Sequence, residues 1–228
     1  MVTVNTESLA ETLDVVNDAF FYRQVLTKSE RRDVARWIAE MQGKSGSYAG
    51  MFAPTSSDRS NGIKVFTGEM VRSGAATGHI LGEESCRTLI LLGIADAAVK
   101  NALDRATLGM LQRLKQTETA GKVYGLYCCG LCSVAYWRHV VVGGLDRNEE
   151  RLAAGMKALK SYRDGSSRWR RFPFYYTLLA LSEMDLKSAL DEMRYAAPAL
   201  ERYLKRSSGE SKYSKRKRII SERILKRC

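Results

Sequence analysis

His79, Glu83 and Arg87 follow one another at steps of four residues, so on a helix they lie on one face. A histidine beside a carboxylate can act as a general acid or base, because the carboxylate fixes the imidazole tautomer and raises its pKa. The same spacing also suits a ladder of ion pairs on a solvated helix face. If the protein is an enzyme, we expect His79 and Glu83 to be catalytic and Arg87 to bind ligand.

Three of the five cysteines lie close together before a histidine, as Cys128, Cys129, Cys132 and then His139. Thiolates and imidazoles suit zinc, but structural zinc usually has two separated ligand pairs, and here one thiol cluster faces a single histidine. We therefore expect core packing, with a redox or nucleophilic thiol or a metal ligand as alternatives, and predict no metal or cofactor. Cys132, Tyr136 and His139 share a helix face and are expected to line a ligand cavity.

Basic and aromatic residues alternate from Arg168 to Tyr176. This composition suits phosphate contact combined with base stacking, whereas a packed Trp169 with solvated arginines is the structural alternative. A third interpretation is an anionic head group at the mouth of an apolar cavity, because a guanidinium can bind two anionic oxygens at once. We predict that Arg168, Arg170 and Arg171 bind such a group.

The net charge of +12 is concentrated at one end of the chain, because residues 205–228 hold ten lysines and arginines against two glutamates. We predict that residues 207–228 form a flexible basic tail, which can order as a short helix on meeting a partner. Nucleic acid or an anionic surface would be attracted to it, and a solubilising tail without a partner is the alternative. The predicted polyanion-binding residues are Lys215, Arg216, Lys217 and Arg218.

The elements that must position these residues are helices in pairs. An amphipathic helix, a polar turn with glycine and an aromatic residue, and a more apolar helix recur around turns at 42–48, 116–124 and 164–169. Such repetition indicates stacked helical hairpins, each burying its apolar face against its neighbours. We predict an all-α domain over residues 1–206 with about eight helices, near 6–22, 27–42, 83–93, 96–118, 132–142, 148–162, 176–181 and 186–204.

A long polar segment interrupts this pattern at residues 53–73. A loop of about 20 residues inside a compact domain is usually functional or mobile, so the segment is a candidate lid over a site. A tolerated surface insertion is the alternative.

The turns carry a resemblance to a known family. Gln42 followed by Gly46-Ser47-Tyr48 resembles the Gln-Trp repeat of squalene-hopene cyclases and related triterpene cyclases, and residues 164–169, which end in Trp169, resemble a second copy. The resemblance implies the α/α-toroid that terpene cyclases share with protein prenyltransferases, with Gln42, Tyr48 and Trp169 as structural braces. A full toroid has about twelve helices, so eight would make an open arc unless a homodimer completes the ring. The aspartate-rich motifs of the family are absent, which leaves enzymatic activity open.

Composition narrows the class of protein. With 228 residues, 45% of them hydrophobic, the chain is long enough for one packed domain. It contains no run of about 18 apolar residues and no export signal, and its cysteine number is odd, so we expect a cytoplasmic protein with reduced thiols that does not span a membrane.

Together these observations predict a helical-repeat domain that binds an apolar or isoprenoid-like small molecule in its concave interior, with catalysis left open. One alternative is a non-catalytic scaffold for a protein or peptide. A second alternative is binding of nucleic acid through the basic tail.

Overall fold

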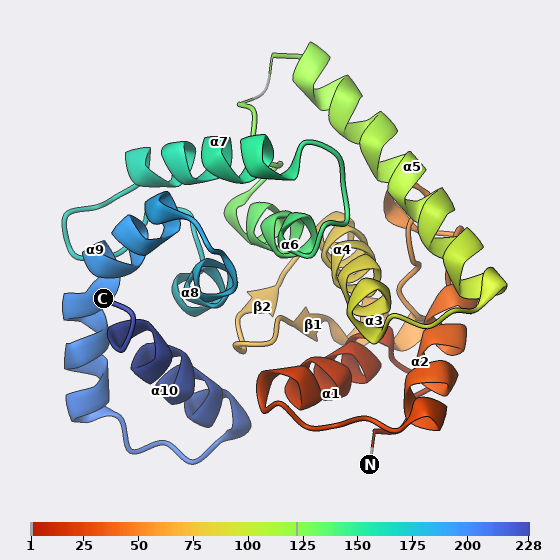
Figure 1. The fold of residues 1–228 in the computed structure, drawn as a ribbon, viewed down its shortest axis with the longest axis horizontal. Helices are drawn as coiled ribbons and strands as arrows, with labels where there is room; N and C mark the ends of the chain where they lie inside the picture. Colours follow the sequence, from red (N-terminus) through yellow and green to blue (C-terminus); the bar gives the residue numbers. More distant parts are fainter. Residues whose placement is uncertain (1, 122) are drawn as a thin grey trace.

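The computed structural model describes residues 2–121 and 123–228. The prediction of an all-α protein is confirmed, with two very short strands as the only sheet in the described residues (Figure 1). Within the same residues, no helix combines the length and the apolarity needed to cross a bilayer. The helices are α1 (Leu9–Phe21), α2 (Lys28–Glu40), α3 (Ser56–Asn61), α4 (Gly74–Leu92), α5 (Ala97–Thr119), α6 (Gly130–Val141), α7 (Asn148–Ser161), α8 (Phe174–Glu183), α9 (Lys187–Arg206) and α10 (Lys212–Leu225), and the strands are β1 (Ile63–Lys64) and β2 (Met70–Val71).

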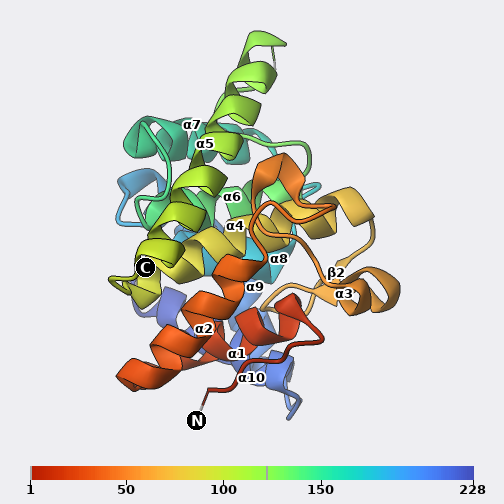
Figure 2. The same ribbon diagram turned by 90° about the vertical axis from the view of Figure 1, so that its right-hand side faces the viewer.

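Successive helices alternate between an inner and an outer layer. Figure 1 shows α4, α6 and α8 inside, with α2, α5, α7 and α9 around them, and Figure 2 shows α2 and α5 covering α4 from one side. The division follows from the sequence, because α4 is buried almost all round whereas α5 buries a single stripe. The stripe consists of Val99, Ala102, Ala106, Met110 and Leu114.

The inner layer runs in a circle that the C-terminal helix closes. Helix α1 packs on α4, then α4 on α6, α6 on α8 and α8 on α10. Between α10 and α1, Arg216 forms ion pairs of 2.6 Å with Asp14 and 2.8 Å with Asp18. The Arg216 guanidinium also lies 3.8 Å from the centre of the Phe66 ring. A single chain therefore closes the circle without help from a second copy.

The prediction of a flexible tail over residues 207–228 is wrong for most of that segment. Residues 212–225 form α10, which packs on α8 and α9 and buries Ile220 and Ile224. The physical reason is that two isoleucines four residues apart give the basic segment an apolar stripe. This stripe packs against the other helices of the same chain, so the helix forms without a partner.

The candidate lid at residues 53–73 is fixed to α1, and its second half is largely buried against the inner helices. Asp58 accepts hydrogen bonds from Ser8 Oγ and from the backbone N–H groups of Leu9 and Ala10, which fixes the segment to the first turn of α1. Ile63, Val65, Phe66 and Val71 are buried. The expected apolar hollow is therefore occupied on this side by the chain itself.

The recurring turns act as braces between hairpins. Gln42 pairs with Phe52, and Arg163 with Trp169, in matching isolated β-bridges. The Gln42 side chain donates to Gly50 O (2.9 Å) and accepts from Arg105 of α5 (2.6 Å). Trp169 Nε1 donates to Glu192 of α9 at 2.8 Å. The turn residues thus tie each loop to the next outer helix.

Candidate functional sites

Two histidines share one buried carboxylate between α4 and α6. Glu83 Oε1 accepts a hydrogen bond from His79 Nε2 at 3.0 Å, and Glu83 Oε2 accepts one from His139 Nδ1 at 2.5 Å. All three residues are at most 1% exposed. The predicted pair His79 and Glu83 is therefore in contact, and His139 joins it from α6. The row is not a solvated ladder, because α4 is an inner helix.

Electrostatics keeps the shared carboxylate ionised. Burial by itself would raise the pKa of Glu83, but the hydrogen bonds and charges of His139 and His79 outweigh it and lower the pKa to about 2. Each oxygen of the carboxylate holds one imidazole N–H, which fixes both rings. Within the described residues, the other ring nitrogens, His79 Nδ1 and His139 Nε2, are buried without a hydrogen-bond partner.

Aromatic residues cover His79. Its ring stacks on Tyr127 with centroids 4.2 Å apart and lies 4.9 Å from the ring of Tyr48. The hydroxyls of Tyr48 and Tyr127 share a 2.6 Å hydrogen bond. Burial and this hydrogen bond raise the pKa of Tyr127 far above its usual range, so its hydroxyl stays protonated. Tyr48 ends the first recurring turn and Tyr127 lies in the segment before α6, so a bracing turn also helps to enclose the histidine.

The thiol cluster lies beside His79. The Sγ atoms of Cys128 and Cys132 and a ring nitrogen of His79 all lie within 4.8 Å of one another. Cys129 caps α6, where its sulfur accepts the Cys132 N–H at 3.4 Å. Hydrogen bonds from the thiols of Cys128 and Cys132 hold the pKa of Cys129 well below its usual range. The sequence interpretation grouped these thiols with His139, and the structure groups them with His79, 49 positions before Cys128.

The prediction that Cys132, Tyr136 and His139 line a ligand cavity is not matched by the structure. They are 0%, 1% and 0% exposed and fill the core beside α4. The hydroxyl of Tyr136 accepts from Arg151 Nη1 at 3.3 Å. The shared helix face was predicted correctly, but it meets another inner helix, so packing rather than a hollow covers it.

A second charged network begins at the neighbouring positions of α4 and α6, Glu84 and Arg138, and extends to α8. Arg138 makes two hydrogen bonds to Glu183, of 2.9 Å and 3.0 Å, and a third to Glu84. Arg87 donates to Glu183 at 2.8 Å and to Asn17 at 2.6 Å. Burial lowers the pKa of Arg87, and the neighbouring charge of Arg138 lowers it further. Two guanidinium groups are thus held rigidly around one carboxylate, and Arg87 is separated from the His79 and Glu83 pair.

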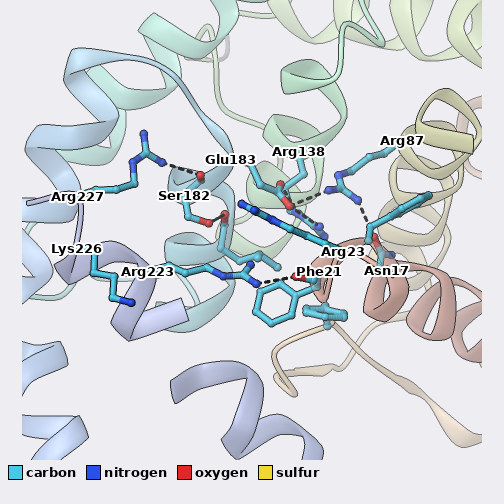
Figure 3. A pocket seen from close by; sticks show the side chains of 13 residues that line it. Asn17, Phe21, Arg23, Arg87, Arg138, Ser182, Glu183, Arg223, Lys226 and Arg227 are labelled. Atoms are coloured by element: carbon cyan, nitrogen blue, oxygen red, sulfur yellow. Dashed lines mark hydrogen bonds and ion pairs between the residues drawn. The ribbon is translucent and has the colours of Figure 1, made fainter. Parts of the chain in front are cut away.

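A pocket of about 560 Å³ opens next to this network (Figure 3). We call it the axial pocket, because residues of α1, α4, α6, α8 and α10 line it. Its described lining has six cationic side chains against the single carboxylate of Glu183, and an apolar part made by Phe20, Phe21, Phe66 and Leu179. The cationic residues are Arg23, Arg87, Arg138, Arg223, Lys226 and Arg227.

Helix ends face this pocket. The last residues of α1 and α8 line it, and α10 ends directly before Lys226. Each helix C-terminus carries the equivalent of roughly −0.5 charge, which attracts cations. Arg223 donates to Phe21 O at 2.7 Å, and Arg227 donates to Ser182 O at 2.8 Å. These bonds explain part of the arginine content, yet the six cations still exceed the charges of Glu183, of Glu84 behind Arg138, and of three helix ends.

The predicted anion-binding residues lie elsewhere. Arg168, Arg170 and Arg171 are exposed and do not line the axial pocket, and the guanidinium of Arg168 covers the Phe174 ring at 4.3 Å. They belong to the turn before α8, whereas the pocket lies where α8 ends. Arg87 was predicted to bind ligand, and Arg223, Lys226 and Arg227 belong to the basic segment that the sequence indicated, but their meeting with Arg23 and Arg138 in one pocket arises only in the folded chain.

The predicted polyanion-binding run is divided by the folding of α10. Arg216 is 2% exposed and bonded to Asp14 and Asp18, so its assignment to polyanion contact is corrected. Lys215 and Arg218 are exposed, and Lys217 is half-buried with its ammonium 5.1 Å from the Tyr175 ring. Four consecutive residues of a helix point in different directions around its axis. Arg216 is the one of the four that points into the protein.

No family model matches the chain, and searches of curated proteins and of solved structures gave no significant match. The resemblance to terpene cyclases therefore stays a prediction, and the two sites are interpreted from their own geometry.

Proposed function

We propose that the protein binds a small phosphorylated or diphosphate-bearing molecule with an apolar portion in the axial pocket. The excess of cationic side chains in that pocket is the observation that carries the proposal. An isoprenoid diphosphate, the ligand class that the family resemblance implies, has both of the required parts.

The pocket is suited to this ligand because of its size and because two of its arginine side chains are already held in place. Its volume of about 560 Å³ falls within the usual range for small-molecule sites. Arg87 and Arg138 are already held by Glu183, Asn17 and Glu84, so they lose little freedom when an anion binds. Arginine recognises phosphate oxygens through paired N–H donors, and Phe20 and Phe21 offer an apolar wall.

The proposal concerns binding rather than catalysis. His79 and Glu83 are predicted to be the pair for proton transfer, but they are buried between α4 and α6 and do not line the axial pocket. We assign no proton transfer to the bound anion. A cytoplasmic location, which the odd number of thiols favours, would also give access to phosphorylated metabolites.

Calorimetric titration with three probes tests the proposal. We expect inorganic pyrophosphate to bind, geranyl diphosphate to bind more tightly, and geraniol not to bind. Affinity should fall as salt is raised, because the contact is mainly between charges. Equal binding of geraniol and geranyl diphosphate would show that the charges do not recognise the ligand.

A matched pair of double variants localises the binding. Lys226→Gln with Arg227→Gln should weaken pyrophosphate binding by at least about tenfold, since each lost charged hydrogen bond is worth about 1.5 to 3 kcal/mol. Arg168→Gln with Arg170→Gln removes the same charge from exposed positions outside the pocket and should leave affinity unchanged. Equal losses in both variants would show non-specific attraction instead of a site.

A further inference from the structure

We propose that His79, Cys128 and Cys132 bind a divalent metal ion of the zinc class. Their three ligand atoms converge within 4.8 Å, although the residues come from α4, the turn before α6 and α6 itself. Two sulfurs and one imidazole nitrogen form a donor set that favours zinc over magnesium or calcium. This site is separate from the axial pocket and from the function proposed there.

The unpartnered nitrogen of His79 is the second observation. Nδ1 is buried and has no hydrogen-bond partner in the described residues, whereas Nε2 donates to Glu83. Leaving a buried polar atom unsatisfied is costly, and a metal ion would supply the missing partner. Metal-bound histidines usually donate their other ring N–H to a carboxylate, which fixes the tautomer. Glu83 occupies that place and acts as a positioning residue.

The distances allow a metal ion with little rearrangement. Zn–S bonds of about 2.3 Å and Zn–N bonds of about 2.0 Å put tetrahedral ligand atoms roughly 3.5 to 3.8 Å apart. The ligand atoms therefore need to approach by at most about 1.0 to 1.3 Å from the separation of up to 4.8 Å. Cys128 lies in an exposed turn before α6, so its side chain can make this adjustment.

Cys129 contacts the thiols of Cys128 and Cys132 but is not one of the three residues whose ligand atoms converge. Its sulfur accepts the Cys132 N–H at the start of α6 and therefore has a structural role as helix cap. The cluster offers three protein ligands, and a water molecule would complete the tetrahedral coordination of the ion. A serine caps a helix at least as well as a cysteine, so Cys129→Ser is a matched control that keeps the fold.

Metal content of the full-length chain tests the proposal. We expect one zinc ion per chain after purification from zinc-supplemented cells, measured by inductively coupled plasma mass spectrometry. Cys128→Ser and Cys132→Ser should retain about a tenth or less, while Cys129→Ser keeps its ion. Cys86→Ser, which changes a cysteine that is also buried but lies outside the cluster, should keep the ion as well and controls for lost packing.

Cobalt substitution gives an independent readout. The Co²⁺ protein should show thiolate-to-metal charge transfer of the strength expected for two thiolates, unchanged in Cys129→Ser. Metal should also raise the melting temperature of the wild-type chain and of Cys129→Ser, but not that of Cys132→Ser. A wild-type chain that takes up neither metal overturns the proposal. So does equal metal loss in Cys129→Ser and Cys132→Ser, or a Cys129–Cys132 disulfide in the protein purified under reducing conditions.

Discussion

The region between α4 and α6 and the axial pocket balance charge in opposite ways. Between the helices, one carboxylate is matched to two imidazoles that hold it from both sides. At the pocket, six cations face one lining carboxylate, and five inner helices contribute to the wall. Within the described residues, the first arrangement lacks partners only for the outer ring nitrogens of the two histidines, His79 Nδ1 and His139 Nε2, which are both buried. The second leaves positive charge that an anion from outside can neutralise.

The largest expected effect concerns the buried carboxylate. Glu83→Gln should lower the free energy of unfolding by about 3 to 5 kcal/mol, because removing one partner of a buried charged network leaves the others uncompensated. Urea denaturation measures the change. Glu40→Gln alters an exposed glutamate at the end of α2 and should have little effect. A loss no larger than that of the control would mean that His79 and His139 do not depend on this carboxylate.

Low pH should reduce the contribution of Glu83 to the free energy of unfolding. The pKa of Glu83 is about 2 in the folded chain against an ordinary value of 4.5, so the unfolded chain binds the extra proton first. The stabilisation is present above about pH 4.5 and is lost as the pH falls towards 2, by on the order of 3 kcal/mol. Glu183, whose pKa is also lowered because Arg138 and Arg87 outweigh its burial, adds to this loss. Unfolding curves at pH 5, 4 and 3 should show a flatter dependence in Glu83→Gln.

The contacts of Arg216 that close the circle should contribute less to the free energy of unfolding than the buried carboxylate of Glu83. Arg216→Gln should cost about 2 kcal/mol, because it removes charged hydrogen bonds to Asp14 and Asp18. In a double-mutant cycle with Asp14→Asn, the two losses should be less than additive, as contacting residues are coupled. Strict additivity would indicate that α10 is held by its apolar stripe alone.

The smallest expected change in the free energy of unfolding is at the rim of the axial pocket. Lys226→Gln should change the free energy of unfolding by less than about 0.5 kcal/mol, because Lys226 is exposed at the rim of the axial pocket. The same variant should weaken pyrophosphate binding in the titration described above. A clear loss of stability without ligand would instead assign this cation to holding the helix ends.

Short-range sequence patterns predicted a helix well where its cap and its apolar stripe lie within a few residues of one another. Thr27 and Glu30 form a capping box at the start of α2, and α5 is an amphipathic helix that buries a single stripe, both signals within a few residues of sequence. The start of α4 was placed nine residues too late, at residue 83 instead of Gly74. Its first turns are rich in glycine, alanine and threonine and look like loop, although Ser73 caps them. This longer helix is what puts His79 and Glu83 on one buried face.

The sequence by itself determined the helical class, the pairing of His79 with Glu83 and the bracing turns, because each depends on residues a few positions apart. Only the tertiary structure decided that His79 meets Cys128 and Cys132, that Arg216 closes the circle, and that six distant cations share one pocket. These contacts join residues 49 to 202 positions apart. Such pairs are set by how inner helices pack around a common axis, and helix periodicity carries no information about that packing.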